Sequence, residues 1–436
     1  MNVLRMTTLR AKGPGPRKPW QWALASICAL GVLLAFGRPG FAELLSAWVQ
    51  YAAHGTVAAR AVTDDLACPA ITVDGRTAAM GQRAAPNEAF PVRICETALP
   101  ANAAAATIGG LALPLPARAP QRILVVGDTG CRVKVMIVPL VQDCDDPAAW
   151  PWRSLAQAAA ALNPDLVIHL GDYYYREDAC PPGFAGCAKS PHGDSWPTWD
   201  ADFFAPARPL LAAAPFVLVR GNHEDCRRGG AGWTRLLDPG PFDPAVPCVE
   251  HDPLYVATAG ALAIAVLDSA IAPDPSADPR LVPLYASEFA ALRGLPGPAW
   301  LVMHRPLYGV VRLVDGHVEG GNATLVAGLG DELPAGVELL LAGHIHVLQV
   351  SNFAGGGPPQ LIAGASGDVL DKQAPPDLAG MVVGGRRITD GFSLGGFGFA
   401  MMERTGLAWR ASIYDAAGKL LRRCNLEARR LDCAGR

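Results

Sequence analysis

The sequence lacks a marked excess of either charge. Its 436 residues contain 37 Lys and Arg against 40 Asp and Glu, a formal net charge of -3 at pH 7. This balance provides no long-range attraction toward nucleic acid or an anionic membrane, so charge predicts neither as a partner. Internal repeats and low-complexity blocks are also lacking: the 47 Gly and 39 Pro are spread between apolar runs, which is typical of a loop-rich globular protein.

No Cys-x-x-Cys pair is present, which argues against a cysteine-rich zinc site. Of the 11 cysteines, Cys28 lies in an apolar run near the N-terminus and the others form an even set. Their order suggests local disulfides between successive members, each closing a loop in an oxidising compartment, although sequence does not establish connectivity. The ten are Cys68, Cys95, Cys131, Cys144, Cys180, Cys187, Cys226, Cys248, Cys424 and Cys433.

The N-terminus has the layout of a secretory signal. Five basic residues precede the apolar stretch 20–37, and small residues stand at Gly40 and Ala42. This pattern predicts a signal peptide over residues 1–42 with cleavage after Ala42, and therefore an exported protein, periplasmic or secreted. If the stretch is retained, it is just long enough to anchor the protein, and only then is a membrane an expected partner. The sequence predicts no oligomeric state.

Residues 43–120 are predicted to precede the main domain as a small Ala/Pro-rich, partly β segment. Residues 43–60 have mixed helical character, and short alternating runs typical of strands follow Cys68. The Pro-rich run 113–120 is the predicted linker, so the main domain is expected over 121–436.

From Gln121 onward, strand and helix signals alternate, which predicts a βαβ series with a mostly parallel sheet. Beyond Asn222 the apolar runs are mainly strand-like and begin with a hairpin within 254–267, so a second sheet packed on the first is expected. The expected strands of the βαβ series are 123–127, 166–170 and 216–219, and the expected helices are 152–162, 199–213 and 285–295.

Polar residues follow five of the apolar runs. Because the carboxyl ends of neighbouring parallel strands meet at one edge of a sheet, their side chains are expected at one rim. Carboxylate, amide and imidazole groups suit first-row transition metals, and seven ligands are too many for one ion, so two ions bridged by a carboxylate are expected. The set is Asp128, Asp172, Tyr175, Asn222, His304, His344 and His346.

The order of these residues resembles the calcineurin-like metallophosphoesterase superfamily. Most of that superfamily has Asp-x-His in the first block, where this sequence has Gly130; the purple acid phosphatase branch has Gly-Asp-x-Gly there and a tyrosine three residues after the second acid, as Tyr175 is here. The resemblance covers about residues 121–346 and implies an α/β fold, the four-layer α/β/β/α sandwich. The blocks are Gly127-Asp128-Thr-Gly130, Gly171-Asp172-Tyr-Tyr-Tyr175, Gly221-Asn222-His223-Glu224, His304 and Gly343-His344-Ile-His346.

The resemblance implies a role for each ligand. Asp128, Tyr175 and His346 would hold a ferric ion. Asn222, His304 and His344 would hold a divalent ion, Zn, Mn or Fe, and Asp172 would bridge the two metals. Two divalent ions are the alternative.

Two further histidines are candidate catalytic residues. His223 matches the histidine that contacts the phosphoryl group in the family. His317, in Asp-Gly-His-Val-Glu-Gly, resembles a substrate-side histidine of the family. Arg305 is expected either to contact phosphate or to form a salt bridge, whereas His192 and His251 are expected at the surface.

Together these features predict an exported binuclear-metal phosphoesterase that hydrolyses small-molecule phosphate esters by attack of a metal-bound hydroxide. An acid-phosphatase-like phosphomonoesterase is favoured by the purple-branch motifs. A phosphodiesterase or nucleotide pyrophosphatase would use the same metals. A non-catalytic binding protein on this scaffold is the third reading, but such proteins usually lose ligands, and here none is missing.

Overall fold

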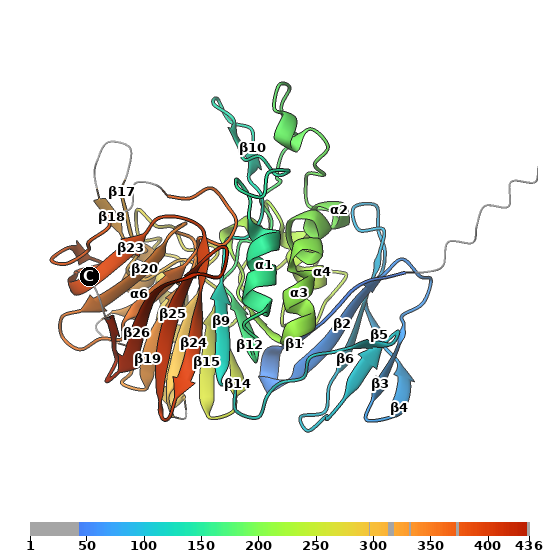
Figure 1. Ribbon diagram of the computed structural model, residues 1–436, viewed down its shortest axis with the longest axis horizontal. Coiled ribbons are helices and arrows are strands. Elements are labelled where there is room, and N and C mark those ends of the chain that lie inside the picture. Colours follow the sequence, from blue (N-terminus) through green and yellow to red (C-terminus); the bar gives the residue numbers. More distant parts are fainter. Residues whose placement is uncertain (1–42, 296, 313–317, 331–332, 372–374, 434–436) are drawn as a thin grey trace, which may run out of the picture. The chain divides into compact units, whose positions relative to one another are not determined.

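Two large β-sheets form the centre of the protein. The computed structural model describes residues 43–436 except 296, 313–317, 331–332, 372–374 and 434–436 (Figure 1). The first sheet has 11 strands in the order β27-β26-β25-β24-β9-β12-β13-β1-β2-β6-β5, and the second has eight in the order β14-β15-β16-β19-β21-β20-β23-β22.

The first sheet combines a parallel centre with antiparallel flanks. β9, β12 and β13 are parallel and almost wholly buried, which is why they have continuous apolar sequences instead of alternating ones. Its strands are β1 (Leu44–Tyr51), β2 (Val57–Thr63), β5 (Gly81–Ala84), β6 (Arg93–Ala98), β9 (Arg122–Val126), β12 (Leu166–His169), β13 (Phe216–Leu218), β24 (Gly398–Thr405), β25 (Ala408–Asp415), β26 (Leu420–Glu427) and β27 (Arg430–Cys433).

The second sheet has a parallel core formed by β15, β16, β19 and β21. Its strands are β14 (Tyr255–Ala259), β15 (Leu262–Leu267), β16 (Ala299–Met303), β19 (Val337–Ala342), β20 (Leu348–Phe353), β21 (Gln360–Ala363), β22 (Val382–Val383) and β23 (Arg386–Leu394). Smaller sheets contain β3 (Ala70–Val73), β4 (Arg76–Ala79), β7 (Ala106–Ile108) and β8 (Leu111–Ala112), then β10 (Val133–Lys134) with β11 (Leu140–Val141), and β17 (Val310–Arg312) with β18 (Val318–Gly320).

Helices cover the outer faces of both large sheets. α1 and α3 pack on the first sheet through one buried cluster, and α5 and α6 pack on the second through another. A third cluster, with Val125, Ile168, Ile264 and Leu341 among its members, lies between the sheets. The helices are α1 (Trp152–Ala160), α2 (Trp196–Trp199), α3 (Ala205–Ala213), α4 (Gly230–Leu236), α5 (Val282–Ala291) and α6 (Ala323–Leu329), with a π-helix (Asp200–Phe204) between α2 and α3.

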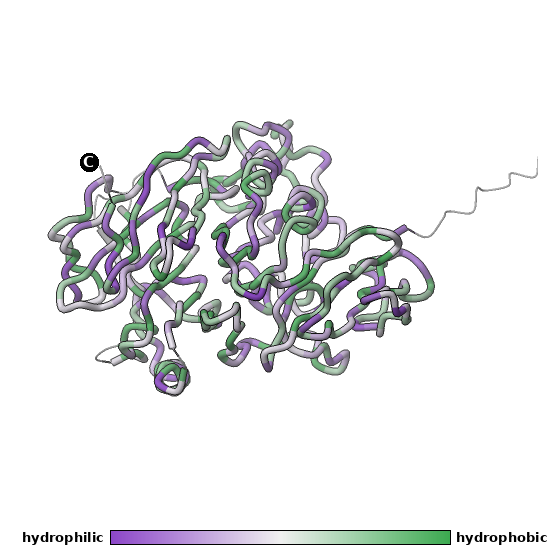
Figure 2. Tube along the Cα trace, turned by 60° about the horizontal axis from the view of Figure 1, so that its bottom comes forward, coloured by the Kyte–Doolittle hydropathy of each residue, from purple (hydrophilic) through white to green (hydrophobic). Residues whose placement is uncertain are grey.

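This layering confirms the expected α/β/β/α sandwich, and a β-rich N-terminal segment is present as well. Figure 2 shows hydrophobic segments recurring along the strands of both sheets. Among the helices within the described ranges, none has the length and apolar character needed to cross a bilayer.

The helical character predicted for residues 43–60 is wrong. They form most of the antiparallel pair β1–β2, in which Val49 lies opposite Ala59. Trp48 packs into the cluster beneath the helices, whereas Ala47 and Val49 pack into a separate N-terminal cluster. Because both faces of β1 are buried, its apolar residues do not alternate with polar ones, and the pattern does not distinguish a strand from a buried helix.

The N-terminal strands extend the first sheet. β1 pairs in parallel with β13 through Gln50 and Phe216, and β2 pairs with β6. Arg60, whose side chain is fully buried, ties these strands to the chain after α4: it donates to Glu96 Oε2 at 2.5 Å and to the carbonyls of Leu236 and Asp238, each at 2.7 Å.

Disulfides join each successive pair of the ten predicted cysteines. The bonds are Cys68–Cys95, Cys131–Cys144, Cys180–Cys187, Cys226–Cys248 and Cys424–Cys433. The local pairing expected from their order is therefore confirmed.

We expect Arg60→Met to lower the free energy of unfolding by about 3 kcal/mol, because it leaves the Leu236 carbonyl buried without its donor and removes the charge paired with Glu96. Urea unfolding under oxidising conditions measures the change. Arg76→Met, an exposed site on β4, is the matched control and should change stability by less than about 0.5 kcal/mol. Equal stability of the two variants would contradict this role of Arg60.

Candidate metal centre

The predicted ligands lie where strands of the two sheets end. Asp128 and Asp172 follow β9 and β12, and Asn222 begins a short 3-10 helix after β13. His304 and His344 follow β16 and β19 of the second sheet. Since these strands are parallel within each sheet, their carboxyl ends deliver the side chains to one place.

The backbone at this rim is held in unusual conformations. Asp128, Asp172 and His344 have positive φ values of 57°, 56° and 69°. Non-glycine residues in this left-handed region are uncommon and cluster at functional sites. The conformations turn the side chains inward directly after the strands.

The glycines before the ligands leave room for the carboxylates. A Cβ at Gly221 would lie 2.1 Å from Asp172 Oδ1, and one at Gly343 would lie 2.5 Å from Asp128 Oδ2. Any larger residue at either position would therefore displace an acid. This explains why Gly-Asn and Gly-His are the sequences found here.

Two groups of potential ligands share one carboxylate. Ligand atoms of Asp172, His304 and His344 lie within 4.8 Å of one another, as do those of Asp128, Asp172 and His346. Asp172 belongs to both groups and is only 1% exposed. Such an arrangement suits two ions with Asp172 between them.

Tyr175 belongs to the group around Asp128. Its hydroxyl lies 2.6 Å from Asp172 Oδ2, 3.3 Å from Asp128 Oδ1 and 3.1 Å from His346 Nε2. A Cβ at Gly130 would lie 2.9 Å from the Tyr175 nitrogen and 3.0 Å from its Cδ2. The tyrosine therefore fits because position 130 is glycine, and the histidine common at this position in the superfamily would collide with it.

Asn222 completes the set, with its Oδ1 3.0 Å from His304 Nε2. The structure thus brings together all seven residues that the sequence pointed to. His317, the second candidate catalytic residue, lies outside the described residues.

The rings of His304 and His346 are oriented by backbone carbonyls. His304 Nδ1 donates to the carbonyl of Leu170 at 2.8 Å, and His346 Nδ1 donates to that of Val369 at 2.6 Å. A carbonyl only accepts, so the neutral form of each ring has its free lone pair on Nε2, which faces the acids. This tautomer and orientation are what a histidine ligand requires, so the residues present fit a bound metal.

His344 is oriented by groups outside the predicted set. Its Nε2 lies 3.1 Å from Asp274 Oδ2 and 3.0 Å from Arg305 Nη1. Arg305 also pairs with Asp274, so of the two roles expected for this arginine the structure contains the salt bridge. Asp274 stands in the Pro-rich loop 268–281, outside the strand-end blocks, so no sequence motif indicates it.

The electrostatics of the centre are dominated by burial of charge. Burial raises the pKa of Asp128, whereas His304 and His223 outweigh burial and hold the pKa of Asp172 well below its usual range. Burial lowers the pKa of His304, but Asp172 and Asp128 more than compensate and bring it to about 9. The carboxylates thus require positive charge beside them, which bound cations would also provide.

Glu224 supports the turn that carries Asp172. Its carboxylate accepts the backbone N–H groups of Asp172 and Tyr173 at 2.9 Å, Gly221 at 3.0 Å and Tyr174 at 3.3 Å. Burial and the nearby Asp172 raise its pKa to about 8. The sequence signal for Glu224 is its place directly after His223 in the third block.

His223 lies over the centre between an acid and a ring. Its Nδ1 is 2.5 Å from Glu177 Oε1, its Nε2 is 4.0 Å from Asp172 Oδ2, and its ring centroid is 4.0 Å from that of Tyr175. Burial raises the pKa of Glu177, but the opposite effect of His223 and Lys134 is larger and brings this pKa down to about 2. Glu177 was not found from the sequence, since its relation to His223 exists only in three dimensions.

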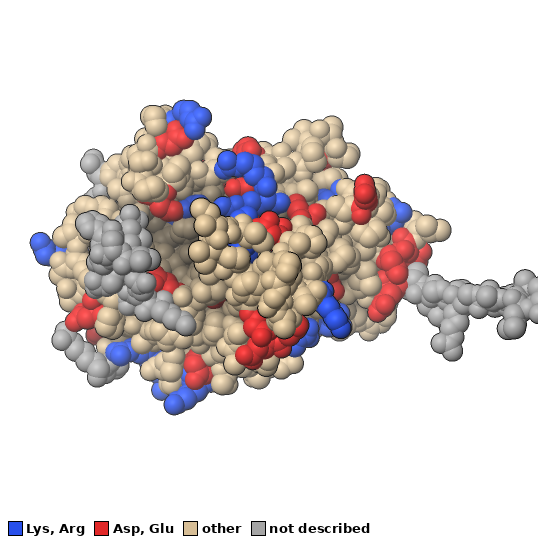
Figure 3. Space-filling model, turned by 90° about the horizontal axis from the view of Figure 1, so that it is seen from above, with Lys and Arg blue, Asp and Glu red and all other residues tan. Residues whose placement is uncertain are grey.

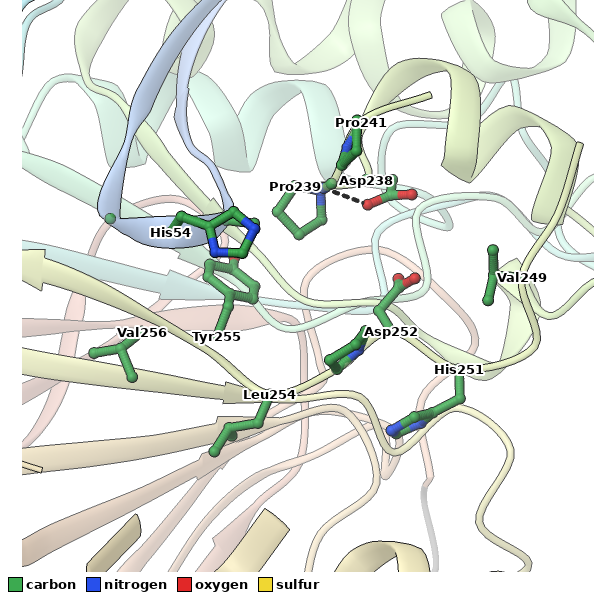
Figure 4. A pocket seen from close by; sticks show the side chains of 14 residues that line it. His54, Asp238, Pro239, Pro241, Val249, His251, Asp252, Leu254, Tyr255 and Val256 are labelled. Carbon is green, nitrogen blue, oxygen red and sulfur yellow. Dashed lines mark hydrogen bonds between the residues drawn. The ribbon is translucent and has the colours of Figure 1, made fainter. Parts of the chain in front are cut away.

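A cavity of about 550 Å³ lies away from this centre and contains none of the seven predicted ligands (Figure 4). Its acids already have partners, since Asp238 accepts from Gly240 at 2.6 Å and Asp252 accepts from Trp233 Nε1 at 2.9 Å. His251 lines it, and its Nε2 is 3.0 Å from Glu288. The surface position expected for His251 is wrong, because the side chain packs partly buried against α5 and is only 12% exposed.

Comparison with known proteins agrees with this geometry. Residues 121–348 match the family model of the calcineurin-like phosphoesterases. No curated protein matches the sequence.

Two solved structures share the fold. Purple acid phosphatase PPD1 from seeds of yellow lupin (Lupinus luteus) is 15% identical with a TM-score of 0.54, covering 86% of this chain and 72% of that one. A structure of PhoD is 11% identical with a TM-score of 0.50, covering 90% of this chain and 92% of that one. The family model spans more than half of the sequence, and the matched region contains the strands that end at the residues described above. The chain therefore belongs to the calcineurin-like phosphoesterase family.

Proposed function

We propose that this protein is an exported phosphatase that hydrolyses phosphate monoesters at a pair of metal ions. Asp128, Tyr175 and His346 would hold a ferric ion. Asn222, His304 and His344 would hold a divalent ion, Zn, Mn or Fe, with Asp172 shared. The observation that carries the proposal is the position of the Tyr175 hydroxyl, within 3.3 Å of Asp128, Asp172 and His346.

The donor set supports metal-assisted hydrolysis. When bound, two metal ions supply an activated water at neutral pH and positive charge around the phosphoryl oxygens. The residues of the chain fix the ligand geometry beforehand: Glu224 holds the backbone before Asp172, and carbonyls orient the rings of His304 and His346. Such preorganisation lowers the reorganisation needed during the reaction.

His223 is proposed to act on the substrate directly. With Nδ1 against Glu177, the ring presents Nε2 toward the centre. From there it can hydrogen-bond a phosphoryl oxygen or protonate the leaving group. Glu177 lies against Nδ1 and fixes the orientation of the ring, so Glu177 is a positioning residue for His223.

Basic side chains lie beside His223, on the side of the centre that we take as its entrance. Lys134 and Arg228, each 38% exposed, both contact Glu177, with Arg228 Nη1 3.8 Å from it. Disulfides lie close to both partners in the sequence. Glu177 shortly precedes the Cys180–Cys187 bond, and Arg228 shortly follows the first cysteine of the Cys226–Cys248 bond. Positive charge at this position suits an anionic substrate such as a phosphate ester.

Export is proposed from two features. Disulfides persist in oxidising compartments, and each of the ten cysteines within the described ranges is paired. The basic and apolar pattern of residues 1–42 is that of a secretory signal. Retention of that segment as an anchor is the alternative.

We expect Asp172→Asn to lower bound metal and to reduce turnover of p-nitrophenyl phosphate by more than about 100-fold, because an amide is a poor bridging ligand. Elemental analysis of the purified protein measures metal content independently of activity. Asp145→Asn, which changes an exposed acid after Cys144, is the control and should match the wild type. Retained metal together with normal turnover would refute the metal centre, and parallel assays with a phosphate diester test the preference for monoesters.

We expect the purified protein to contain iron and to show a violet charge-transfer band that Tyr175→Phe removes, since the band requires a tyrosinate ligand. Tyr174→Phe is the matched control, because Tyr174 is buried next in sequence and faces the α2 residue Trp199 instead. A visible spectrum decides the matter. A colourless protein whose activity follows added zinc or manganese would remove the ferric ion and Tyr175 from the proposal and leave two divalent ions.

A further inference from the structure

The β10–β11 hairpin ends in an exposed apolar tip. Six consecutive apolar residues, 135–140, occupy the tip: Val135, Met136, Ile137, Val138, Pro139 and Leu140. Ile137 is 104% exposed, Val138 75% and Met136 55%. Scattered exposed hydrophobic residues need no explanation, but a contiguous group on one projection indicates an interaction surface.

The base of this hairpin is held rigidly beside the metal centre. Cys131, three residues after Asp128, is bonded to Cys144. The Val133 N–H donates to the carbonyl of Tyr175 at 3.1 Å, and the Val135 N–H donates to Asp178 Oδ2 at 2.8 Å. The tip is therefore presented at a defined place next to the entrance.

A second apolar loop stands at the same end of the protein (Figure 1). The Cys180–Cys187 bond closes it, and the Cys144 N–H donates to the carbonyl of Gly186 at 2.9 Å, which joins it to the base of the hairpin. Phe184 at its end is 41% exposed. Both projections thus combine a cross-linked base with an apolar tip.

The two projections carry no acidic residue of their own, since residues 131–141 and 180–190 contain Arg132, Lys134 and Lys189 as their charged residues. Acids lie behind both: Asp178 accepts from the Val135 N–H, and the Asp143 carboxylate lies against Gly186. Lys134 is the charged residue directly behind the apolar tip, and its ammonium contacts Glu177 and lies 3.6 Å from Asp178. Figure 3 looks onto this end and shows Lys and Arg side chains near its middle with Asp and Glu side chains directly beside them.

The shape of the tip favours a lipid surface over a protein. A stable protein interface takes about 800 Å² from each partner, far more than a hairpin with two-residue strands presents. A bilayer accepts any convex apolar group, and the tip extends about 10 Å beyond its strands, the depth of the headgroup region.

We propose that the apolar tip 135–140 inserts into the interface of a lipid bilayer and holds the entrance of the metal centre against the membrane surface. Phe184 of the neighbouring loop enters the same interface. This inference depends on surface residues alone, and it holds whether or not the centre has the proposed activity.

The test uses a fluorescent reporter at the tip of the full chain. Cys28→Ser removes the one cysteine outside the disulfides, and Ile137→Cys is then labelled with an environment-sensitive NBD group. Vesicles of phosphatidylcholine with one quarter phosphatidylglycerol are added, with and without bromine on the acyl chains. We expect a blue shift, an emission rise of about two-fold or more, and quenching by the brominated lipid.

Leu407→Cys, labelled in the same way, is the matched control. Leu407 is 95% exposed on the turn between β24 and β25. Because Glu403 of β24 pairs with Arg122 at the start of β9, this turn lies at the edge of the sheet remote from Asp128. The label there should keep the emission it has in water.

The reporter is local, so vesicle binding through the N-terminal apolar stretch alone would leave it unchanged. No blue shift and no quenching at position 137 would overturn the proposal and leave the tip as a surface for a protein partner. Equal quenching at positions 137 and 407 would also overturn it, because that result indicates non-specific adsorption.

Discussion

The site depends on one buried carboxylate, that of Asp172. It accepts hydrogen bonds from the Tyr175 hydroxyl at 2.6 Å and from the backbone N–H of His223 at 2.9 Å, and it lies 3.3 Å from His304 Nε2. A second acid, Asp128, is fully buried close by. Taking two carboxylates out of water costs several kcal/mol for each ion unless cations compensate, so the centre is built to receive positive charge.

The rest of the rim serves to place these acids. Asp128, Asp172 and His344 adopt left-handed backbone conformations, which are costly for residues other than glycine and persist only where surrounding structure imposes them. Here that structure consists of the packed cores around both sheets and of Glu224, which binds successive N–H groups of the Asp172 turn. The same packing that stabilises the fold therefore also sets the geometry of the centre.

The disulfides extend this rigidity to the surface. The bond of the Val133 N–H to the Tyr175 carbonyl joins the base of the hairpin directly to a residue of the centre. Cys131–Cys144 and Cys180–Cys187 then fix the two projecting loops above it. A projection so constrained loses little conformational entropy when it binds, which suits insertion of its apolar tip into a surface.

The sequence by itself determined the parts governed by local pattern. Buried parallel strands require continuous apolar runs, and neighbouring cysteines close short loops; both could be predicted. Only the tertiary structure decided which groups meet across elements: Glu177 with His223, Asp274 with His344, and Arg60 with the chain after α4. It also decided that residues 44–51 form a strand, because burial on both faces removes the alternation that identifies one. Such contacts join residues far apart in the chain, and their partners leave no periodic trace in the sequence.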